Sequence, residues 1–270
     1  MRPRRLATWG SAMLSLALAT CLLGACATLP GGPQIGVLPS PAQAIQRLED
    51  RRRAVRSLVL QGEISLRGSR GESSGEALIQ GQYPDRLRVE VSGPFGRPVL
   101  SLISNGAWLI AVDYQAGRAY AGRASRRNLA RFLGLALSLR EVYALLSGSV
   151  PLLARPEHSR LTPGPEPGQA TLHLLGAGGS LAQKIVFALR DYTVLRAHLQ
   201  QWGRAESLQV RFGDFSSTPQ GLRIPYRISV QDRRDREVSL LADSVVINQP
   251  LDGVLFEPQL PGGVPVERLP

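Results

Sequence analysis

The sequence predicts a mainly β (α+β) fold built from antiparallel strands. About eleven or twelve segments of the chain alternate apolar and polar residues, which is typical of half-buried strands. Turn residues separate these segments at the short spacing that an antiparallel barrel or sandwich requires. Helical periodicity is confined to three short segments. A single curved sheet has one apolar concave face, and we expect the helices to cover it.

Residues 1–25 are predicted to be a lipoprotein signal peptide. Three arginines in residues 1–5 precede an apolar run at 13–23, and small residues lead to a cysteine in Leu23-Gly24-Ala25-Cys26. These are the parts of a secretory signal, and the run is too short to span a bilayer core of about 30 Å. The motif resembles the bacterial lipobox, which implies a covalent lipid on Cys26. The alternative is an ordinary signal peptide with an incidental cysteine.

Charge and cysteine content restrict the partners. Removal of 1–25 takes away three arginines and no acid, so the net charge falls from +11 to +8. Nucleic-acid binding is possible on charge alone, but export argues against it. A solvated basic face is the commonest explanation, and attraction to anionic lipid headgroups is the second. Cys21 would leave with the signal, so the mature domain has no disulfide.

Composition and the periodicity of apolar residues predict the elements of the first half of the chain. Residues 26–41 hold prolines, glycines and no charge, and they are predicted to be a tether. A helix is expected to begin with Ser40 as N-cap and Pro41 at the first helical position. The pair Asn105-Gly106 predicts a tight type I′ hairpin. Alternation predicts strands near 60–66, 76–82, 86–91, 99–103, 107–112 and 119–121.

Two short amphipathic helices are predicted next, near 125–133 and 138–147. Ser125 can cap the first, and Ser138 with Glu141 forms a capping box for the second. Five prolines predict a long loop at 151–169. The sequence leaves open whether the helices fill the concave face or leave an apolar cavity. Strands are predicted again near 172–174, 185–189, 195–199, 208–212, 224–230 and 238–240.

No constellation of catalytic residues is found, and we expect no enzyme activity. The pattern Gly-x-Ser-x-Gly occurs once, at residues 71–75, but it follows a predicted hairpin turn and leads into a strand rather than a helix, so it does not form a nucleophile elbow. Thiol catalysis is excluded because Cys26 is the one mature cysteine. His158, His173 and His198 have no metal-type partner at nearby spacing, so we expect surface histidines and no metal site.

A series of motifs points to a family. Asp85-Arg86-Leu87-Arg88-Val89 is followed by Gly93-Pro94-Phe95-Gly96, then by Leu133-Gly134-Leu135 and Ser138-Leu139-Arg140-Glu141, and finally by Leu255-Phe256-Glu257-Pro258. In this order, with a lipobox in front, they resemble the LolA/LolB-like lipoprotein localisation family, and its outer-membrane receptor group LolB in particular. The resemblance implies that residues 42–270 form an incomplete β-barrel of about 11 strands, with a short helical lid over an apolar cavity.

The resemblance also implies a function. It indicates a receptor that is lipid-anchored in the outer membrane, faces the periplasm, binds the acyl chains of lipoproteins and helps to insert them into that membrane. The implied partners are acylated lipoproteins, a LolA-like periplasmic carrier and outer-membrane lipids, with the protein as a monomer and no cofactor besides the lipid on Cys26. The alternative is a structural envelope lipoprotein whose sheet is a docking platform for a protein complex. A third possibility, a lipid hydrolase, would need an activated nucleophile, and we identify none in the sequence.

The resemblance also assigns candidate site residues, by their positions in the family's motifs. Gly93, Pro94, Phe95 and Gly96 match the family's membrane-insertion loop, and burying one phenylalanine among acyl chains contributes about 1.5–3 kcal/mol. The alternative is that Phe95 folds onto the core. Ordinary core packing is the commoner explanation for each single residue that we expect to contact acyl chains. These residues are Leu60, Ile64, Leu87, Val89, Val91, Trp108 and Phe187 on strands and Leu129, Phe132, Leu139, Val142 and Leu146 on the lid.

Two positions separate the branches of the family. The carrier branch has an arginine before the proline at the turn that precedes Asp85, and this arginine holds its lid shut. Tyr83 occupies that place here, which favours the receptor. Ala27 follows the cysteine, where an aspartate commonly retains lipoproteins at the inner membrane, so we expect the outer membrane.

Overall fold

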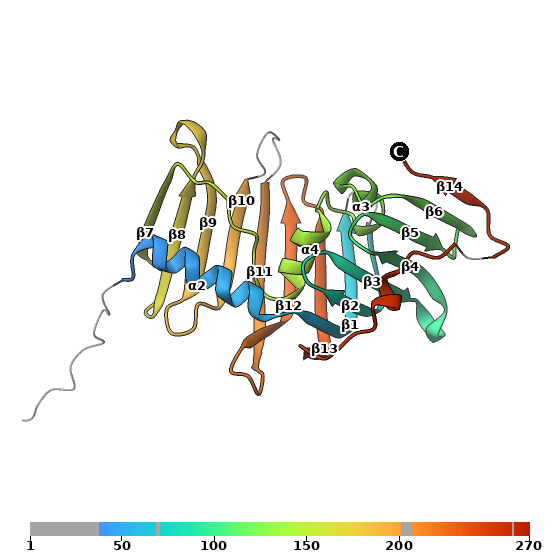
Figure 1. Ribbon diagram of the computed structural model, residues 1–270, viewed down its shortest axis with the longest axis horizontal. Helices are drawn as coiled ribbons and strands as arrows, with labels where there is room; N and C mark the ends of the chain where they lie inside the picture. Colours follow the sequence, from blue (N-terminus) through green and yellow to red (C-terminus); the bar gives the residue numbers. More distant parts are fainter. Residues whose placement is uncertain (1–37, 69–70, 201–206, 261) are drawn as a thin grey trace, which may run out of the picture. The chain divides into compact units, whose positions relative to one another are not determined.

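One sheet of fourteen strands runs through the computed structural model, in the order β14-β6-β5-β4-β3-β2-β1-β13-β12-β11-β10-β9-β8-β7 (Figure 1). The structure describes residues 38–270 apart from 69–70, 201–206 and 261. The sheet is curved and open, because β14 and β7 form its two edges. The predicted mainly β fold with an incomplete barrel is therefore confirmed. Cys26, the predicted signal peptide and most of the predicted tether lie outside the described residues.

The elements have the following bounds. The helices are α2 (Pro41–Ala54), α3 (Arg126–Leu133) and α4 (Leu139–Leu146), with single 3₁₀ turns η1 (Pro94–Gly96), η2 (Ala177–Gly179) and η3 (Gly253–Phe256). The first strands are β1 (Ser57–Gly68), β2 (Gly71–Gln82), β3 (Arg86–Ser92), β4 (Pro98–Ser104), β5 (Trp108–Asp113), β6 (Arg118–Arg123) and β7 (His158–Pro163). The others are β8 (Gln169–Leu175), β9 (Leu181–Ala188), β10 (Val194–Gln200), β11 (Ser207–Ser217), β12 (Arg223–Asp232), β13 (Glu237–Ile247) and β14 (Val266–Arg268).

Strand β1 joins the two halves of the sheet, because it pairs with β2 on one side and with β13 on the other. Its register against β13 shifts between Gln61 and Gly62. A Cβ on Gly62 would lie 2.1 Å from the carbonyl oxygen of Leu241, so only glycine allows the two backbones to approach this closely.

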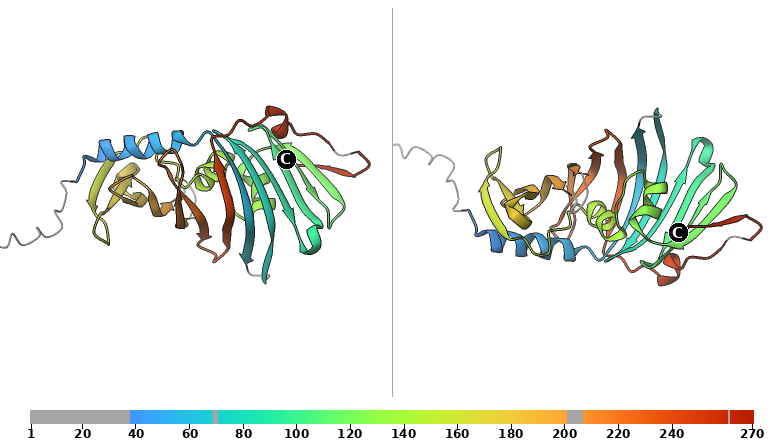
Figure 2. Two further views of the ribbon diagram at one scale, coloured as in Figure 1. Left: turned by 90° about the horizontal axis from the view of Figure 1, so that it is seen from below. Right: turned by 90° about the horizontal axis from the view of Figure 1, so that it is seen from above.

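The core lies on one face of the sheet, which we call the inner face. Alternate residues such as Leu60, Leu87 and Ile185 point to this face and pack with Leu48 of α2 and Tyr143 of α4 in one cluster. Figures 1 and 2 show α2 along the β7–β11 part of the sheet, α4 in front of β12 and β13, and α3 near the β1–β6 part. The opposite, outer face carries the polar residues of the same alternation.

The three predicted helices are confirmed together with their caps. Ser40 accepts a hydrogen bond from the backbone N–H of Gln43, and the side chain of Gln43 accepts one from the backbone N–H of Ser40. Pro41 occupies the first helical turn, as the sequence predicts. No helix in the described ranges is long and apolar enough to cross a bilayer.

Two predictions about strands and turns are wrong, and one short strand was not predicted. The predicted loop 151–169 contains the edge strand β7, which ends at Pro163 and has little apolar alternation because most of it is exposed. The three-residue β14 pairs in parallel with β6 and leaves no periodic signal. The turn at Asn105 is not type I′, because Asn105 lacks a positive φ; its Oδ1 instead accepts hydrogen bonds from the N–H groups of Ala107 and Trp108.

Candidate functional site

An apolar cavity of about 390 Å³ lies between the inner face and the two helices α3 and α4. This volume is within the range of about 300–1,000 Å³ that is usual for ligand pockets. Strands β1, β2, β3, β4, β12 and β13 supply its floor, with Ile64, Leu66, Ile79, Val89, Val91, Leu100, Ile228, Val230, Val238 and Leu240. The helices and their connection supply its roof, with Phe132, Leu133, Leu135, Leu137, Val142, Leu145 and Leu146. No charged side chain of the described residues lines it.

Local sequence determines where the roof helices start and stop. The hydroxyl of Ser125 accepts a hydrogen bond from the backbone N–H of Asn128, and Gly134 ends α3 with φ of 74°. Ser138 and Glu141 form the predicted capping box at the start of α4. Each helix is short, so its stability comes from its apolar stripe on the sheet rather than from its own hydrogen bonds.

Helix α4 is attached to the sheet through Tyr143. The Tyr143 hydroxyl donates a hydrogen bond of 3.0 Å to the carbonyl oxygen of Val55, and burial, followed by the proximity of Tyr83, raises the pKa of this hydroxyl well above its usual value. The ring of Tyr83 meets that of Tyr143 edge-on, with centroids 6.0 Å apart. Arg140 adds an exposed ion pair with Asp85 at 3.0 Å. Tyr83 thus occupies the position where the resemblance places a carrier's arginine, and it contacts the lid through an aromatic pair.

The loop 93–96 lies at the rim of the cavity. Gly93 and Pro94 are among the lining residues, and the next residue, Phe95, is 99% exposed. Phe95 has φ of 63°, a left-handed conformation that is unfavourable for a bulky residue. The side chain does not fold onto the core, so an aromatic ring is held in water beside the opening of an apolar cavity.

The structure brings half of the predicted acyl-contact residues to this cavity. Ile64, Val89, Val91, Phe132, Val142 and Leu146 line it. Five others are packed fully into the core, namely Leu60, Leu87, Leu129, Leu139 and Phe187. Phe187 lies in the other half of the sheet, on β9, where its ring stacks on Tyr192 at 5.5 Å.

Trp108 lies on the outer face instead. Alternation along β5 directs Leu109 and Ala111 into the main core, which leaves Trp108 52% exposed on the opposite face. The guanidinium of Arg123, from the neighbouring strand, lies over its ring at 5.3 Å.

Other lining residues were not predicted from the sequence. Those on β12 and β13 join the floor because β13 pairs with β1, a contact across more than half the chain that no local signal reveals. Leu135 and Leu137 belong to the short segment between α3 and α4. The sequence signal that could have identified them is that they are alternate apolar residues between the cap Gly134 and the cap Ser138.

Comparison with known proteins places this fold among LolA-like domains. No family model and no curated protein sequence matches the chain. Among solved structures, a LolA superfamily protein from Nitrosomonas europaea has a TM-score of 0.54 at 12% identity, over 82% of this chain and 99% of that one. A putative outer membrane lipoprotein-sorting protein domain from Vibrio parahaemolyticus has 0.53 at 11%, over 79% and 95%. A DUF1329 family protein from Desulfovibrio piger has 0.53 at 10%, over 80% and 95%.

These identities are low, so the likeness shows the fold alone. The protein is an open, curved and mainly antiparallel sheet with two short helices over an apolar cavity, and its fold is similar to that of the LolA superfamily structure. Within the described residues, no group of three or more His, Cys, Asp or Glu side chains is placed to hold a metal ion.

Proposed function

We propose that this protein is a lipid-anchored receptor that binds the acyl chains of lipoproteins and helps to insert them into the outer membrane. The observation that carries the proposal is the apolar cavity of about 390 Å³ under α3 and α4, with the exposed Phe95 at its rim. The names of two structural neighbours, a LolA superfamily protein and a putative lipoprotein-sorting domain, add support.

The chemistry of the cavity fits an acyl chain. Its floor and roof are built mainly from Leu, Ile and Val side chains, and a buried methylene contributes about 0.8 kcal/mol. Partial insertion of an acyl chain is therefore favourable by several kcal/mol. Binding is reversible, because a membrane offers the chain an equally apolar environment. The exposed Arg140–Asp85 pair contributes about 1 kcal/mol or less to holding the lid, so the buried apolar face of α4 and the hydrogen bond from Tyr143 to Val55 are the main contacts that lid opening must break.

Delivery requires a device that meets the acceptor membrane. In this proposal the lipid on Cys26 anchors the protein durably in the outer membrane, facing the periplasm. The Phe95 loop makes a separate, transient contact with acyl chains. A LolA-like periplasmic carrier would bring the acylated lipoprotein to the rim.

A cavity-filling substitution tests the proposal. Val91→Trp on β3 places an indole in the cavity, whereas Val246→Trp adds the same ring at a 46% exposed site outside it. We expect a fluorescent triacylated peptide to bind the full-length protein and the Val246→Trp variant equally, and Val91→Trp at least about tenfold more weakly. Absence of binding to the unmodified protein would contradict the receptor and favour the docking-platform alternative.

A further inference from the structure

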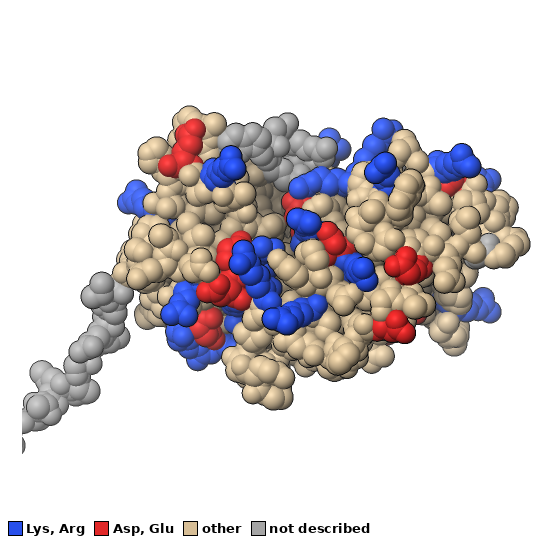
Figure 3. Space-filling model, in the orientation of Figure 1, with Lys and Arg blue, Asp and Glu red and all other residues tan. Residues whose placement is uncertain are grey.

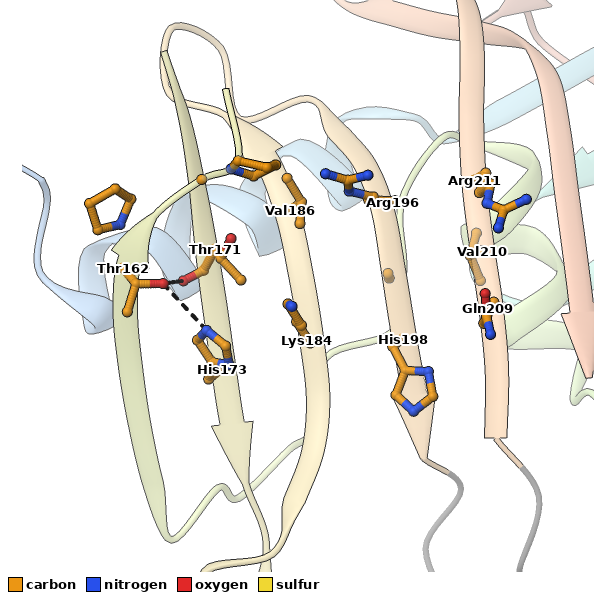
Figure 4. Close-up of a pocket in the computed structure, with 14 residues that line it drawn as sticks. Thr162, Thr171, His173, Lys184, Val186, Arg196, His198, Gln209, Val210 and Arg211 are labelled. Carbon is orange, nitrogen blue, oxygen red and sulfur yellow. Dashed lines mark hydrogen bonds between the residues drawn. The ribbon is translucent and has the colours of Figure 1, made fainter. Parts of the chain in front are cut away.

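A second hollow, of about 650 Å³, lies on the outer face of the β7–β11 part of the sheet (Figure 4). Figure 4 shows it from the side opposite α2, which passes behind the strands. Five basic or imidazole side chains from four neighbouring strands line it, namely His173, Lys184, Arg196, His198 and Arg211. This hollow and the apolar cavity share no residue.

The strand register gathers these side chains. Lys184 is directly opposite His173 on one side and His198 on the other, which forms a row across β8, β9 and β10. In the adjacent row, Arg196 is directly opposite Arg211. Neighbouring strands are about 4.8 Å apart, and Lys184, Arg196 and Arg211 stand on the three successive strands β9, β10 and β11. In Figure 4 the guanidinium of Arg196 points toward β9 and that of Arg211 points away from Arg196, so both long side chains would turn toward a shared ligand.

Among the residues that the structure describes, the charges in this hollow are not balanced. No carboxylate is among its lining residues, and Lys184, Arg196 and Arg211 form no ion pair within the described ranges. Like charges directly opposite each other on paired strands are destabilising. By contrast, Figure 3 shows blue and red side chains intermixed over α2, where Arg52 pairs with Glu49 at 2.7 Å.

A threonine hydroxyl and a proline-rich segment form the edge of the hollow on the β7 side. The Thr162 hydroxyl is 3.3 Å from Nε2 of His173, and Pro163, Gly164 and Pro165 line the edge. Burial lowers the pKa of His173, and the nearby Lys184 and Arg160 lower it further. A bound anion would remove part of the electrostatic cause of that shift.

We propose that this hollow binds a phosphate group, either free or as the ester of a small headgroup. Two arginines supply planar, bidentate donors and Lys184 a compact charge, which is the donor set that phosphate oxygens prefer. A bound phosphate would also neutralise part of the charge of Arg196 and Arg211, which are directly opposite each other on β10 and β11. The volume accommodates a headgroup larger than the phosphate itself.

The experiment measures binding to the full-length protein by calorimetry, with probes that carry no acyl chain and so do not report on the apolar cavity. The probes are inorganic phosphate, glycerol 3-phosphate and a tetraglutamate peptide. We expect phosphate or its ester to bind, and Arg196→Gln and Arg211→Gln each to weaken binding at least about tenfold. Arg118→Gln, which removes an exposed charge from β6, is the matched control and should change nothing.

A second readout needs no variant. The imidazole NMR signals of His173 and His198 should shift on phosphate addition, and the pKa of His173 should rise. Tighter binding of glycerol 3-phosphate than of inorganic phosphate would assign the site to esters such as lipid headgroups, and equal binding would assign it to free phosphate. The proposal fails if neither phosphate probe binds at millimolar concentration, if the peptide is preferred, or if Arg118→Gln weakens binding as much as Arg196→Gln.

Discussion

Phe95 combines full exposure of an apolar ring with a left-handed backbone conformation. Each of these features costs folding free energy, and a loop residue with a purely structural role has no reason to keep both. We expect Phe95→Glu to lower the transfer of an acylated lipoprotein from the protein to outer-membrane lipid vesicles, because a charge replaces the ring that enters acyl chains. Uptake of the lipoprotein should be unchanged, because Phe95 is not among the cavity-lining residues. Transfer is measured by vesicle flotation.

The matched control for this loop is Val254→Glu, which places the same charge at a 65% exposed apolar residue away from the rim. Phe95→Gly separates function from stability: it should lose transfer while its free energy of unfolding stays equal or rises by up to about 1 kcal/mol, because glycine tolerates positive φ. Normal transfer by both Phe95 variants would exclude the loop from the mechanism.

His173 makes stability depend on pH. Its pKa is lowered by burial and then by Lys184 and Arg160, so the unfolded chain binds a proton at higher pH than the folded chain does. The free energy of unfolding should therefore fall as pH decreases below the ordinary value of 6.5, until the folded-state pKa is reached. Urea denaturation at pH 7.5 and 5.5 measures this difference, and His173→Gln should reduce it; an unchanged difference in the variant would rule His173 out as its source.

At the level of elements, the lid depends on its caps. Ser138→Ala removes the N-cap hydroxyl of α4 and should cost about 1 kcal/mol of unfolding free energy. Ser40→Ala removes the equivalent cap of α2 at a similar cost. Because α4 helps to roof the cavity and α2 does not, we expect Ser138→Ala to speed the release of a bound acyl probe, measured by stopped-flow fluorescence, and Ser40→Ala to leave it unchanged. Equal release from both variants would show that α4 is not the gate.

Much of this architecture is predictable because its signals are local. The caps at Ser40, Ser125 and Ser138 and the alternation along β3 depend on neighbours a few residues away, and the structure contains them. Whether Trp108 points to the cavity depends instead on which alternate set of β5 side chains faces the core. Whether Phe187 reaches the cavity depends on which half of the sheet is covered by α3 and α4.

The outer hollow was not predicted, although its polar positions were visible as the alternating residues of β8 to β11. Each strand contributes only one or two charges, and His173 and His198 are isolated in sequence. Cross-strand register places Lys184 between them, and register between strands is a tertiary property.

For the molecule as a whole, one sheet carries an apolar cavity on one face and a cationic hollow on the other. Its inner face encloses the apolar cavity in the β1–β4 and β12–β13 region, and its outer face carries the cationic hollow in the β7–β11 region. Since β1 pairs with β13, both sites belong to one continuous hydrogen-bonded sheet. The two proposals can nevertheless be tested separately, because neither site contributes a residue to the other.

The central claim is that acyl chains occupy the cavity beneath α3 and α4. The most direct measurement uses a triacylated peptide with a photoreactive diazirine near the end of one acyl chain, cross-linked to the full-length protein and mapped by mass spectrometry. We expect labels on cavity residues such as Val91, Phe132 and Val142. Labels confined to the outer face, or no labelling above that of a peptide without acyl chains, would contradict the claim.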